Sequence, residues 1–383
     1  MLSRHEMLPL SRAGVDTMGC RDSLTNCPSL CRPHQGVPVT SRRLSHAEIV
    51  ASVAPDTPDA DVESVIVDPR HASDDVREFA KSVALGLTDT PPWLHCRFLY
   101  DDRGSKLFEE ITRQPEYYLT RTEAAILEQN AERICRVTGP VTLIELGSGN
   151  SVKTDYLLKA YSAGGSSVRY VPVDVSETIL HQAKEAIVER HESVTVTGIA
   201  DTYERAFPLF KEFSPAMVLF LGSSIGNFDQ RESHTFWQGL SDALSSRDYL
   251  LLGIDLVKDE ATLNAAYNDA AGVTEAFTRN LFARINRELG ASIELGQIEH
   301  VARYHAERQR VEIYARFRTE QEVYLAPLER TIVVPAGTMV MTEICRKYHL
   351  KKMAAYLRCF DFSVEQVFTD EREWFGLLLL QRR

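Results

Sequence analysis

The sequence lacks any apolar run long enough to span a bilayer, and its first residues lack the apolar segment of a signal peptide. It also lacks the cysteine pattern of a disulfide framework, because its 7 cysteines are odd in number and scattered, as is typical of reduced thiols. Basic residues are in deficit, with 43 Lys and Arg against 54 Asp and Glu and a net charge of -11, which argues against a nucleic-acid or anionic-membrane partner. We therefore predict a cytoplasmic, monomeric protein that acts on a small molecule.

The first part of the chain shows no sign of a packed element. Residues 1–61 mix polar residues, proline and isolated apolar residues without a sustained period, so we predict a disordered extension there. This extension contains Cys20, Cys27 and Cys31, whose spacing matches no common zinc pattern and which have no evident fourth ligand, so we predict no metal site. A helical stripe of apolar residues over 76–87 marks the beginning of the folded chain.

An apolar run that ends in a glycine-rich turn lies at the centre of the folded part. We predict a buried strand over residues 141–146, then the turn with Gly147 and Gly149, then a helix capped by Asn150 or Ser151. Glycines at such a strand-to-helix switch let a ligand approach the backbone, where the free N–H groups of the first helical turn face it. The pattern therefore predicts a nucleotide site at one edge of a parallel sheet.

The details of this turn narrow the kind of nucleotide. A dinucleotide fingerprint would have a third glycine where this chain has Val152, and no P-loop lysine follows, so a nicotinamide dehydrogenase is disfavoured. What remains, Glu145-x-Gly147-x-Gly149, resembles the first motif of Rossmann-like methyltransferases that bind S-adenosylmethionine. The next apolar run ends at Asp174, at the spacing expected for a carboxylate that binds both ribose hydroxyls. The resemblance implies S-adenosylmethionine as cofactor.

Alternating helical and strand patterns fill the rest of the chain. Apolar runs predict three further strands, at 194–199, 217–221 and 249–256. Together with the first two strands they predict a doubly wound parallel sheet of the α/β class. Alternating runs predict an α+β insertion, at 310–319, 330–334 and 338–345. The last two runs, 360–368 and 374–381, return to the sheet as its final pair of strands.

The segment before the first strand predicts two helices and one wall of a pocket. Ser105 is the expected cap of the first helix, and Thr120 or Thr122 that of a second helix that runs to residue 134. Aromatic residues are more numerous on these loops and helix starts than a small core requires, and they predict an aromatic-lined pocket wall that includes Tyr100, Phe108 and Tyr117.

Several long motifs, in the same order, resemble the histidine Nα-methyltransferase of ergothioneine biosynthesis. They are Tyr100–Thr122, Glu145–Gly149, Pro172–Ser176, Phe220–Asn227, Asp255–Asp259 and Tyr267–Thr274. The resemblance covers roughly residues 75–383 and implies trimethylation of the α-amine of L-histidine to hercynine. It also implies a Rossmann-like class I methyltransferase core (122–256 and 348–383) with an inserted α+β substrate-binding domain (62–121 and 257–347).

The same resemblance adds residues to the cofactor site. Lys153, which we predict in the first turn of its helix, would pair with the carboxylate of the cofactor, since a cation there otherwise opposes the helix dipole. Asp201 would hold the adenine amino group. The family has an aromatic residue next, where this chain has Thr202, so Tyr203 is the candidate that replaces it.

Methyl transfer to an amine is an in-line displacement without a covalent protein intermediate, so we predict positioning residues and no catalytic residue. By resemblance, Asn227 and Tyr267 bind the carboxylate of the substrate, and Tyr117 lies by its amino group. Strand periodicity places Glu343 and Cys345 on one face, where they would meet the imidazole.

Two positions depart from the family pattern and leave alternatives open. Cys345 stands where the family has a serine, and Ile313 where it has a methionine; a thiol is a weaker donor of similar shape, so histidine remains favoured. The alternatives are the same chemistry on tryptophan or tyrosine, and a catalytically silent S-adenosylmethionine-binding protein. The joint presence of Tyr117, Asn227 and Tyr267 disfavours the silent protein.

Overall fold

The computed structural model describes residues 72–149 and 151–383. The predicted extension over residues 1–61, its three cysteines and the expected cap Asn150 lie outside the described residues. Within the described ranges, no helix combines the length and the apolar character needed to cross a membrane.

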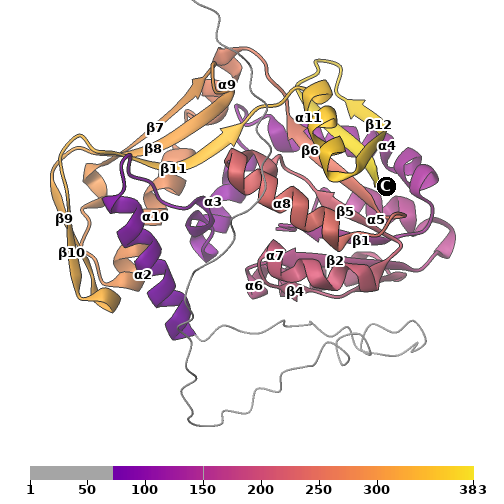
Figure 1. The fold of residues 1–383 in the computed structure, drawn as a ribbon, viewed down its shortest axis with the longest axis horizontal. Helices are drawn as coiled ribbons and strands as arrows, with labels where there is room; N and C mark the ends of the chain where they lie inside the picture. Colours follow the sequence, from indigo (N-terminus) through magenta and orange to yellow (C-terminus); the bar gives the residue numbers. More distant parts are fainter. Residues whose placement is uncertain (1–71, 150) are drawn as a thin grey trace, which may run out of the picture. The chain divides into compact units, whose positions relative to one another are not determined.

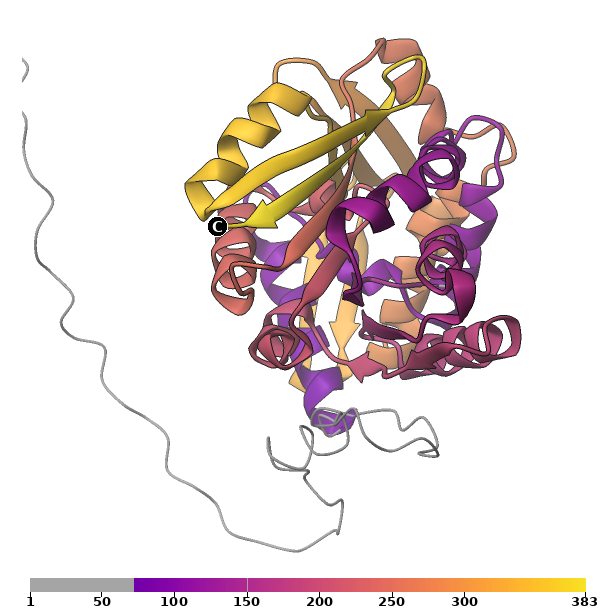
Figure 2. The ribbon, with the colours of Figure 1, turned by 90° about the vertical axis from the view of Figure 1, so that its right-hand side faces the viewer.

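The largest sheet of the described chain has eight strands in the order β12-β13-β6-β5-β1-β2-β3, and β4 pairs with β2 (Figures 1 and 2). Its strands are β1 Thr142–Leu146, β2 Val168–Asp174, β3 Val194–Val196, β4 Ile199–Ala200, β5 Ala216–Phe220, β6 Tyr249–Asp255, β12 Phe362–Thr369 and β13 Phe375–Arg382. Strands β1 to β6 pair in parallel, whereas β13 is antiparallel to β6 and β12 to β13. The predicted doubly wound sheet and its returning final pair are confirmed.

Helices cover both faces of this sheet because both faces are apolar. Leu143 of β1 belongs to the core under α4 (Leu119–Thr138) and α5 (Asp155–Tyr161). Its neighbour Ile144 belongs to the opposite core, under α8 (Gln230–Ala243) and α11 (Leu350–Leu357). Successive side chains of a strand point to opposite faces, so the continuous apolar runs of the sequence are those of strands buried on both sides. Two further helices, α6 (Glu177–Arg190) and α7 (Tyr203–Ala206), complete this part.

A second group of strands and helices lies on the left of Figure 1, whereas the main sheet lies on the right. Its three-stranded antiparallel sheet has the order β11-β8-β7, with β7 Ile298–His305, β8 Arg310–Phe317 and β11 Met339–Arg346. A hairpin of β9 (Gln321–Leu325) and β10 (Arg330–Val334) and the helices α2 (Ala72–Thr88), α3 (Asp102–Thr112), α9 (Glu260–Ala266) and α10 (Val273–Leu289) belong to the same group. The segment before α3 is attached to β11 by backbone hydrogen bonds, Leu94 N to Met341 O (2.7 Å) and Met341 N to Pro92 O (3.0 Å).

The predicted helix caps are wrong. Helix α3 begins before Ser105, because Asp101 accepts the hydrogen bond from the Gly104 N–H at 2.7 Å and so caps it. Helix α4 begins at Leu119 without a side-chain cap, and Thr122 instead donates to the carbonyl of Tyr118 within the helix. A cap needs an extended residue whose side chain reaches a free N–H, and these threonines are already helical.

The turn after β1 also differs from the prediction. Ser151 has a φ of 52° and bonds the hydroxyl of Tyr170, so it caps no helix, and α5 begins only at Asp155. Lys153 therefore lies in the turn before the helix and not in its first turn. The predicted strand 194–199 is two short strands, β3 and β4, separated by Thr197 and Gly198.

Candidate active site

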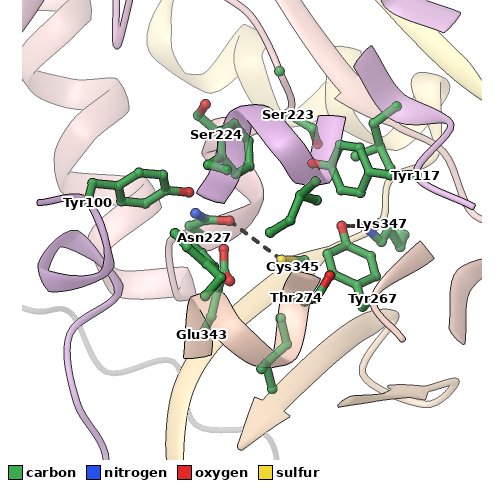
Figure 3. A pocket seen from close by; sticks show the side chains of 16 residues that line it. Tyr100, Tyr117, Ser223, Ser224, Asn227, Tyr267, Thr274, Glu343, Cys345 and Lys347 are labelled. Atoms are coloured by element: carbon green, nitrogen blue, oxygen red, sulfur yellow. Dashed lines mark hydrogen bonds between the residues drawn. The ribbon is translucent and has the colours of Figure 1, made fainter. Parts of the chain in front are cut away.

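A pocket lies between the carboxyl end of the main sheet and the three-stranded sheet. All eight residues that we predicted for the substrate line it, namely Tyr100, Phe108, Tyr117, Asn227, Tyr267, Ile313, Glu343 and Cys345 (Figure 3). They come from α3 and the loops beside it, the turn after β5, the end of α9 and strands β8 and β11. The fold thus brings together side chains from most of the described chain.

Aromatic rings form one wall of this pocket, as predicted. Tyr100 and Phe108 meet edge to face at 5.6 Å between ring centroids, Phe108 and Tyr117 at 6.3 Å, and Tyr117 and Tyr267 at 6.1 Å. Edge-to-face pairs fix the orientation of each ring. Burial holds the pKa of Tyr117 and of Tyr267 well above the ordinary value, so both keep their hydroxyl protons near neutral pH.

The turn that follows β5 forms the polar side of the pocket. Ser223 adopts a left-handed conformation (φ 58°), and its hydroxyl accepts a hydrogen bond from the Asp255 N–H at 3.0 Å. The next four residues form a short 3₁₀ helix, Ser224–Asn227, which ends with the Asn227 amide at the pocket. The Cys345 thiol donates to the Asn227 side-chain oxygen at a sulfur-to-oxygen distance of 3.7 Å.

Glu343 is the carboxylate of the pocket. It pairs with Ile313 across β8 and β11, next to a bulge between Met341 and Glu343, and it lines the pocket together with Cys345. Burial raises the pKa of Glu343 to about 7, against smaller lowering effects of the neighbouring Cys345 side chain, the Lys347 charge and the Asn227 amide. The prediction that Glu343 and Cys345 share one face is confirmed.

The glycine turn lies at the carboxyl edge of β1 and β2. Gly147, at φ 66°, donates to the carbonyl of Val173 at 2.8 Å, and the Gly149 N–H donates to the Asp174 carboxylate at 3.3 Å. A Cβ on Gly149 would meet nothing within 4 Å, so the backbone is open there. The buried hydroxyl of Ser148 has no hydrogen-bond partner among the described residues.

The Asp174 carboxylate can accept further hydrogen bonds from a ligand. Burial raises its pKa above the ordinary value, although the backbone N–H groups of Ser176 (3.0 Å) and Gly149 (3.3 Å) donate to it. Each oxygen of a carboxylate accepts two hydrogen bonds, so both oxygens can also accept from hydroxyl groups. Open glycine backbone, an unpaired hydroxyl and this carboxylate together fit the ribose of an adenosine-containing cofactor.

Asp201 and Thr202 follow β4 at the same edge. Asp201 is 5% exposed, accepts from the Thr202 N–H at 2.7 Å and pairs with Arg205 at 2.9 Å. The ring of Tyr203 packs on Phe220 at 5.7 Å, and a Cβ on Gly147 would come within 2.6 Å of its hydroxyl. Tyr203 therefore supports the glycine turn from the core side.

The sequence did not predict the partner of Lys153. Its ammonium pairs with the carboxylate of Glu123, a fully buried residue of α4. Both oxygens of Glu123 also accept from the Gly222 N–H, at 2.8 and 2.9 Å, at the beginning of the turn that leads to Asn227. Glu123 thus connects the lysine of the cofactor edge with the substrate side of the pocket.

Behind the pocket lies a second buried network, the Asp255 cluster, which consists of Tyr118, Asp255, Lys258 and Lys347. Tyr118 donates to both oxygens of Asp255, at 2.9 and 2.7 Å, and Lys258 and Lys347 reach one oxygen each, at 2.5 and 2.8 Å. Burial lowers the pKa of Lys258 to about 8. Asp255 and Lys258 lie in a motif that carried the family resemblance, but the sequence assigned them no role.

Glu145, the acidic residue of the first motif, has a structural position. It is 3% exposed and accepts hydrogen bonds from Tyr170 and, at 2.7 Å, from Thr154, while burial raises its pKa to about 7. It therefore holds the segment after the glycine turn against β2. Within the described chain, no group of three or more His, Cys, Asp or Glu side chains is arranged to hold a metal ion.

The parallel sheet, the glycine turn with Asp174 at its carboxyl edge and the pocket beside them define an S-adenosylmethionine-dependent methyltransferase. Residues 79–382 match the model of a family described as histidine-specific, S-adenosylmethionine-dependent methyltransferases. The chain belongs to this family.

Individual relatives agree with the family. The chain is 39% identical to the histidine N-alpha-methyltransferase of Mycolicibacterium smegmatis over 302 residues, which cover 79% of this chain and 94% of that protein. It is 33% identical to ergothioneine biosynthesis protein 1 of Neurospora crassa, over 75% of this chain and 31% of that protein. It is 29% identical to the 4-dimethylallyltryptophan N-methyltransferase of Claviceps purpurea, over 56% of this chain and 65% of that protein.

Proposed function

We propose that this enzyme transfers three methyl groups from S-adenosylmethionine to the α-amino group of L-histidine, which gives hercynine, a step towards ergothioneine. The observation that carries the proposal is the carboxylate of Glu343, which makes no direct ion pair among the described residues and lines the pocket beside aromatic and apolar side chains such as Tyr100 and Ile313. A buried carboxylate needs a hydrogen-bond donor, and the imidazole N–H of histidine provides one. The relatives named for histidine methylation support the same substrate.

The cofactor site is proposed at the carboxyl edge of β1, β2 and β4. Gly147 and Gly149 would leave room for the cofactor, Asp174 would accept from the ribose hydroxyls, and Asp201 with Thr202 would hold the adenine. Lys153 would bind the amino-acid end, where it would exchange part of its pairing with Glu123 for a second carboxylate. When bound, the cofactor supplies an electrophilic methyl group.

The reaction requires the chain to hold a neutral amine in line with that methyl group. An α-amine is mostly protonated near neutral pH, so the site must favour its free-base form. Tyr117 is the neighbour that we assign to the amine, because its buried hydroxyl stays neutral and can accept a hydrogen bond from an N–H. Asn227 and Tyr267 would donate to the substrate carboxylate and so fix the amine between the aromatic wall and the cofactor edge.

The side chain of the substrate decides between histidine and its rivals. In our proposal the imidazole lies between Glu343, Cys345 and Ile313. The alternative is methylation of another aromatic amino acid, such as tryptophan or tyrosine. It is supported by the name of the Claviceps purpurea relative, whose substrate is derived from tryptophan. A catalytically silent protein is disfavoured, since the residues proposed for carboxylate and amine are all present at one pocket.

The proposal also covers the domain organisation, the oligomeric state and the cellular compartment. Residues 62–121 and 257–347 would form a substrate-binding domain, and residues 122–256 and 348–383 the methyltransferase core. A monomeric, cytoplasmic enzyme without a nucleic-acid partner is supported by the net charge of -11 and the scattered cysteines.

The proposal is tested by incubating the full chain with S-adenosylmethionine and each of the twenty amino acids separately and by analysing the products by mass spectrometry. We expect mono-, di- and trimethylated histidine in succession, with the trimethylated form as the end product. Absence of methylated histidine, or equal methylation of tryptophan or tyrosine, would overturn the histidine assignment.

A further inference from the structure

Lys347 is a buried cation at the wall of the substrate pocket. Its side chain is 1% exposed, yet it lines the pocket together with Tyr267 and Cys345 (Figure 3). It directly follows β11, whose last residue is Arg346, and lies two positions after Cys345. The segment that carries Glu343 and Cys345 therefore also carries this ammonium to the pocket. A lysine buried this far from water needs compensation by anions or by hydrogen-bond acceptors.

The Asp255 cluster compensates Lys347 only in part. Its direct contacts join two ammonium groups, Lys258 and Lys347, to the single carboxylate of Asp255. When both lysines are protonated, these four residues therefore carry one positive charge in excess beside the pocket, where Glu343 is the carboxylate that also interacts with the Lys347 charge. An ammonium has three N–H donors, and the contacts of Lys347 account for two of them, to Asp255 and to the Tyr267 hydroxyl, each at 2.8 Å.

The contact with Tyr267 fixes the direction of a hydrogen bond. Because an ammonium has no acceptor, the Tyr267 oxygen must accept from Lys347, and its own O–H is left to donate elsewhere. One acceptor near this hydroxyl is the Cys345 sulfur, which is a weak one. A carboxylate in the pocket would be the better acceptor, and the excess positive charge would favour it further.

We propose that Lys347 is a positioning residue that selects substrates with a free α-carboxylate, by holding the Tyr267 hydroxyl as a donor and by supplying the charge that the carboxylate neutralises. This inference rests on the proposed function, because it takes the substrate to be an α-amino acid. It predicts that the enzyme discriminates between L-histidine and histamine, which has the same imidazole and amine but no carboxylate.

The test uses the full chain with S-adenosylhomocysteine bound and measures the dissociation constants of L-histidine and histamine by calorimetry, with competition against L-histidine for weak binding. Lys347→Met keeps the length of the side chain and removes its charge, while Asp255 keeps Lys258 and Tyr118. Lys258→Met is the matched control, because it removes a cation from the same cluster at a residue that does not line the pocket.

We expect the wild type to bind L-histidine at least roughly 100-fold more tightly than histamine. Lys347→Met should weaken L-histidine binding roughly 10- to 100-fold and change histamine binding less than about threefold. Lys258→Met should change the ratio of the two constants by a clearly smaller factor than Lys347→Met does, because it lowers the charge of the cluster but leaves Lys347 to hold the Tyr267 hydroxyl as a donor. Loss of affinity for both ligands in equal measure would show a purely structural role and overturn the inference.

Further outcomes keep the inference testable and separate it from the proposed function. If Lys347→Met does not fold, the wild type and Tyr267→Phe decide: equal binding of L-histidine and histamine by the wild type, or unchanged discrimination in Tyr267→Phe, overturns the inference. If the wild type methylates no histidine in the mass-spectrometric assay, the proposed function fails. If it does so and Lys347→Met keeps the full preference for L-histidine, only the role of Lys347 fails.

Discussion

Replacement of Glu343 by glutamine should make the enzyme more stable and less active at the same pH. Glutamine keeps the shape of the side chain and removes the charge that burial disfavours. Burial raises the pKa of Glu343 from its ordinary 4.5 to about 7 in the folded chain. Below pH 4.5 the group is protonated in both the folded and the unfolded state, so the substitution has no electrostatic effect there.

The sign of the effect on stability follows from proton binding. Between pH 4.5 and 7 the folded state binds more protons at Glu343 than the unfolded state, so this group lowers the free energy of unfolding as the pH rises. The largest decrease in the free energy of unfolding, reached above pH 7, is about 3 kcal/mol. This value is an upper bound, because the carboxylate still interacts with polar groups of the pocket. Glu343→Gln removes this loss, so its advantage over the wild type should grow from pH 4.5 to 7 and then stay constant.

Activity should change in the opposite direction. In our account the Glu343 carboxylate accepts the imidazole N–H, and a hydrogen bond to a charged group contributes about 1.5–3 kcal/mol, so kcat/KM for L-histidine should fall roughly 10- to 150-fold at pH 8. Scanning calorimetry at pH 5.5 and pH 8, beside steady-state kinetics at pH 8, measures both effects. A variant with unchanged kcat/KM, or with no greater gain in melting temperature at pH 8 than at pH 5.5, would refute this reasoning.

The remaining predictions concern the cofactor, the departure from the family and the cluster behind the pocket. Asp174→Ala should weaken S-adenosylmethionine binding by about 1.5–3 kcal/mol, because it removes a charged acceptor from two hydroxyls; unchanged affinity in calorimetry would contradict the cofactor assignment. Cys345→Ser should leave kcat/KM for L-histidine equal or higher, since a hydroxyl is the better donor; a tenfold fall would argue against contact with the imidazole. Tyr118→Phe, which leaves Asp255 with fewer donors, should cost about 1–3 kcal/mol in denaturant unfolding, whereas Tyr249→Phe, at a partly exposed tyrosine, should cost about 0.5 kcal/mol or less.

The main sheet could be predicted because its strands are buried on both faces. The expected strand over 249–256 differs from β6 by one residue, and the expected 330–334 coincides with β10. Strand β7 was missed, because its polar residues, among them His300, Arg303 and His305, hide any apolar period. The predicted start of α3 was wrong for another reason. Asp101 directly precedes the helix, and its carboxylate accepts from the free N–H of Gly104, whereas Ser105 already lies inside the helix.

The pocket lining could be predicted from the family motifs, but its supporting network could not. Tyr118 and Asp255 are separated by 137 positions, and Glu123 and Gly222 by 99. A buried glutamate in a helix has the same sequence signature as a solvated one, because burial depends on which elements pack over it. The partner of Lys153 and the charge beside Tyr267 therefore became visible only in three dimensions.

The most direct test of the account is the ratio of kcat/KM for L-histidine to that for L-phenylalanine and L-tryptophan, measured with the wild-type enzyme and S-adenosylmethionine at pH 8. A site whose carboxylate needs a donor can reject an analogue without one by roughly 10⁴-fold, so we predict a ratio of that order for phenylalanine and a clear preference over tryptophan. Tryptophan or phenylalanine turned over as efficiently as histidine would contradict the role of Glu343 and the histidine assignment, and would leave only the methyltransferase class.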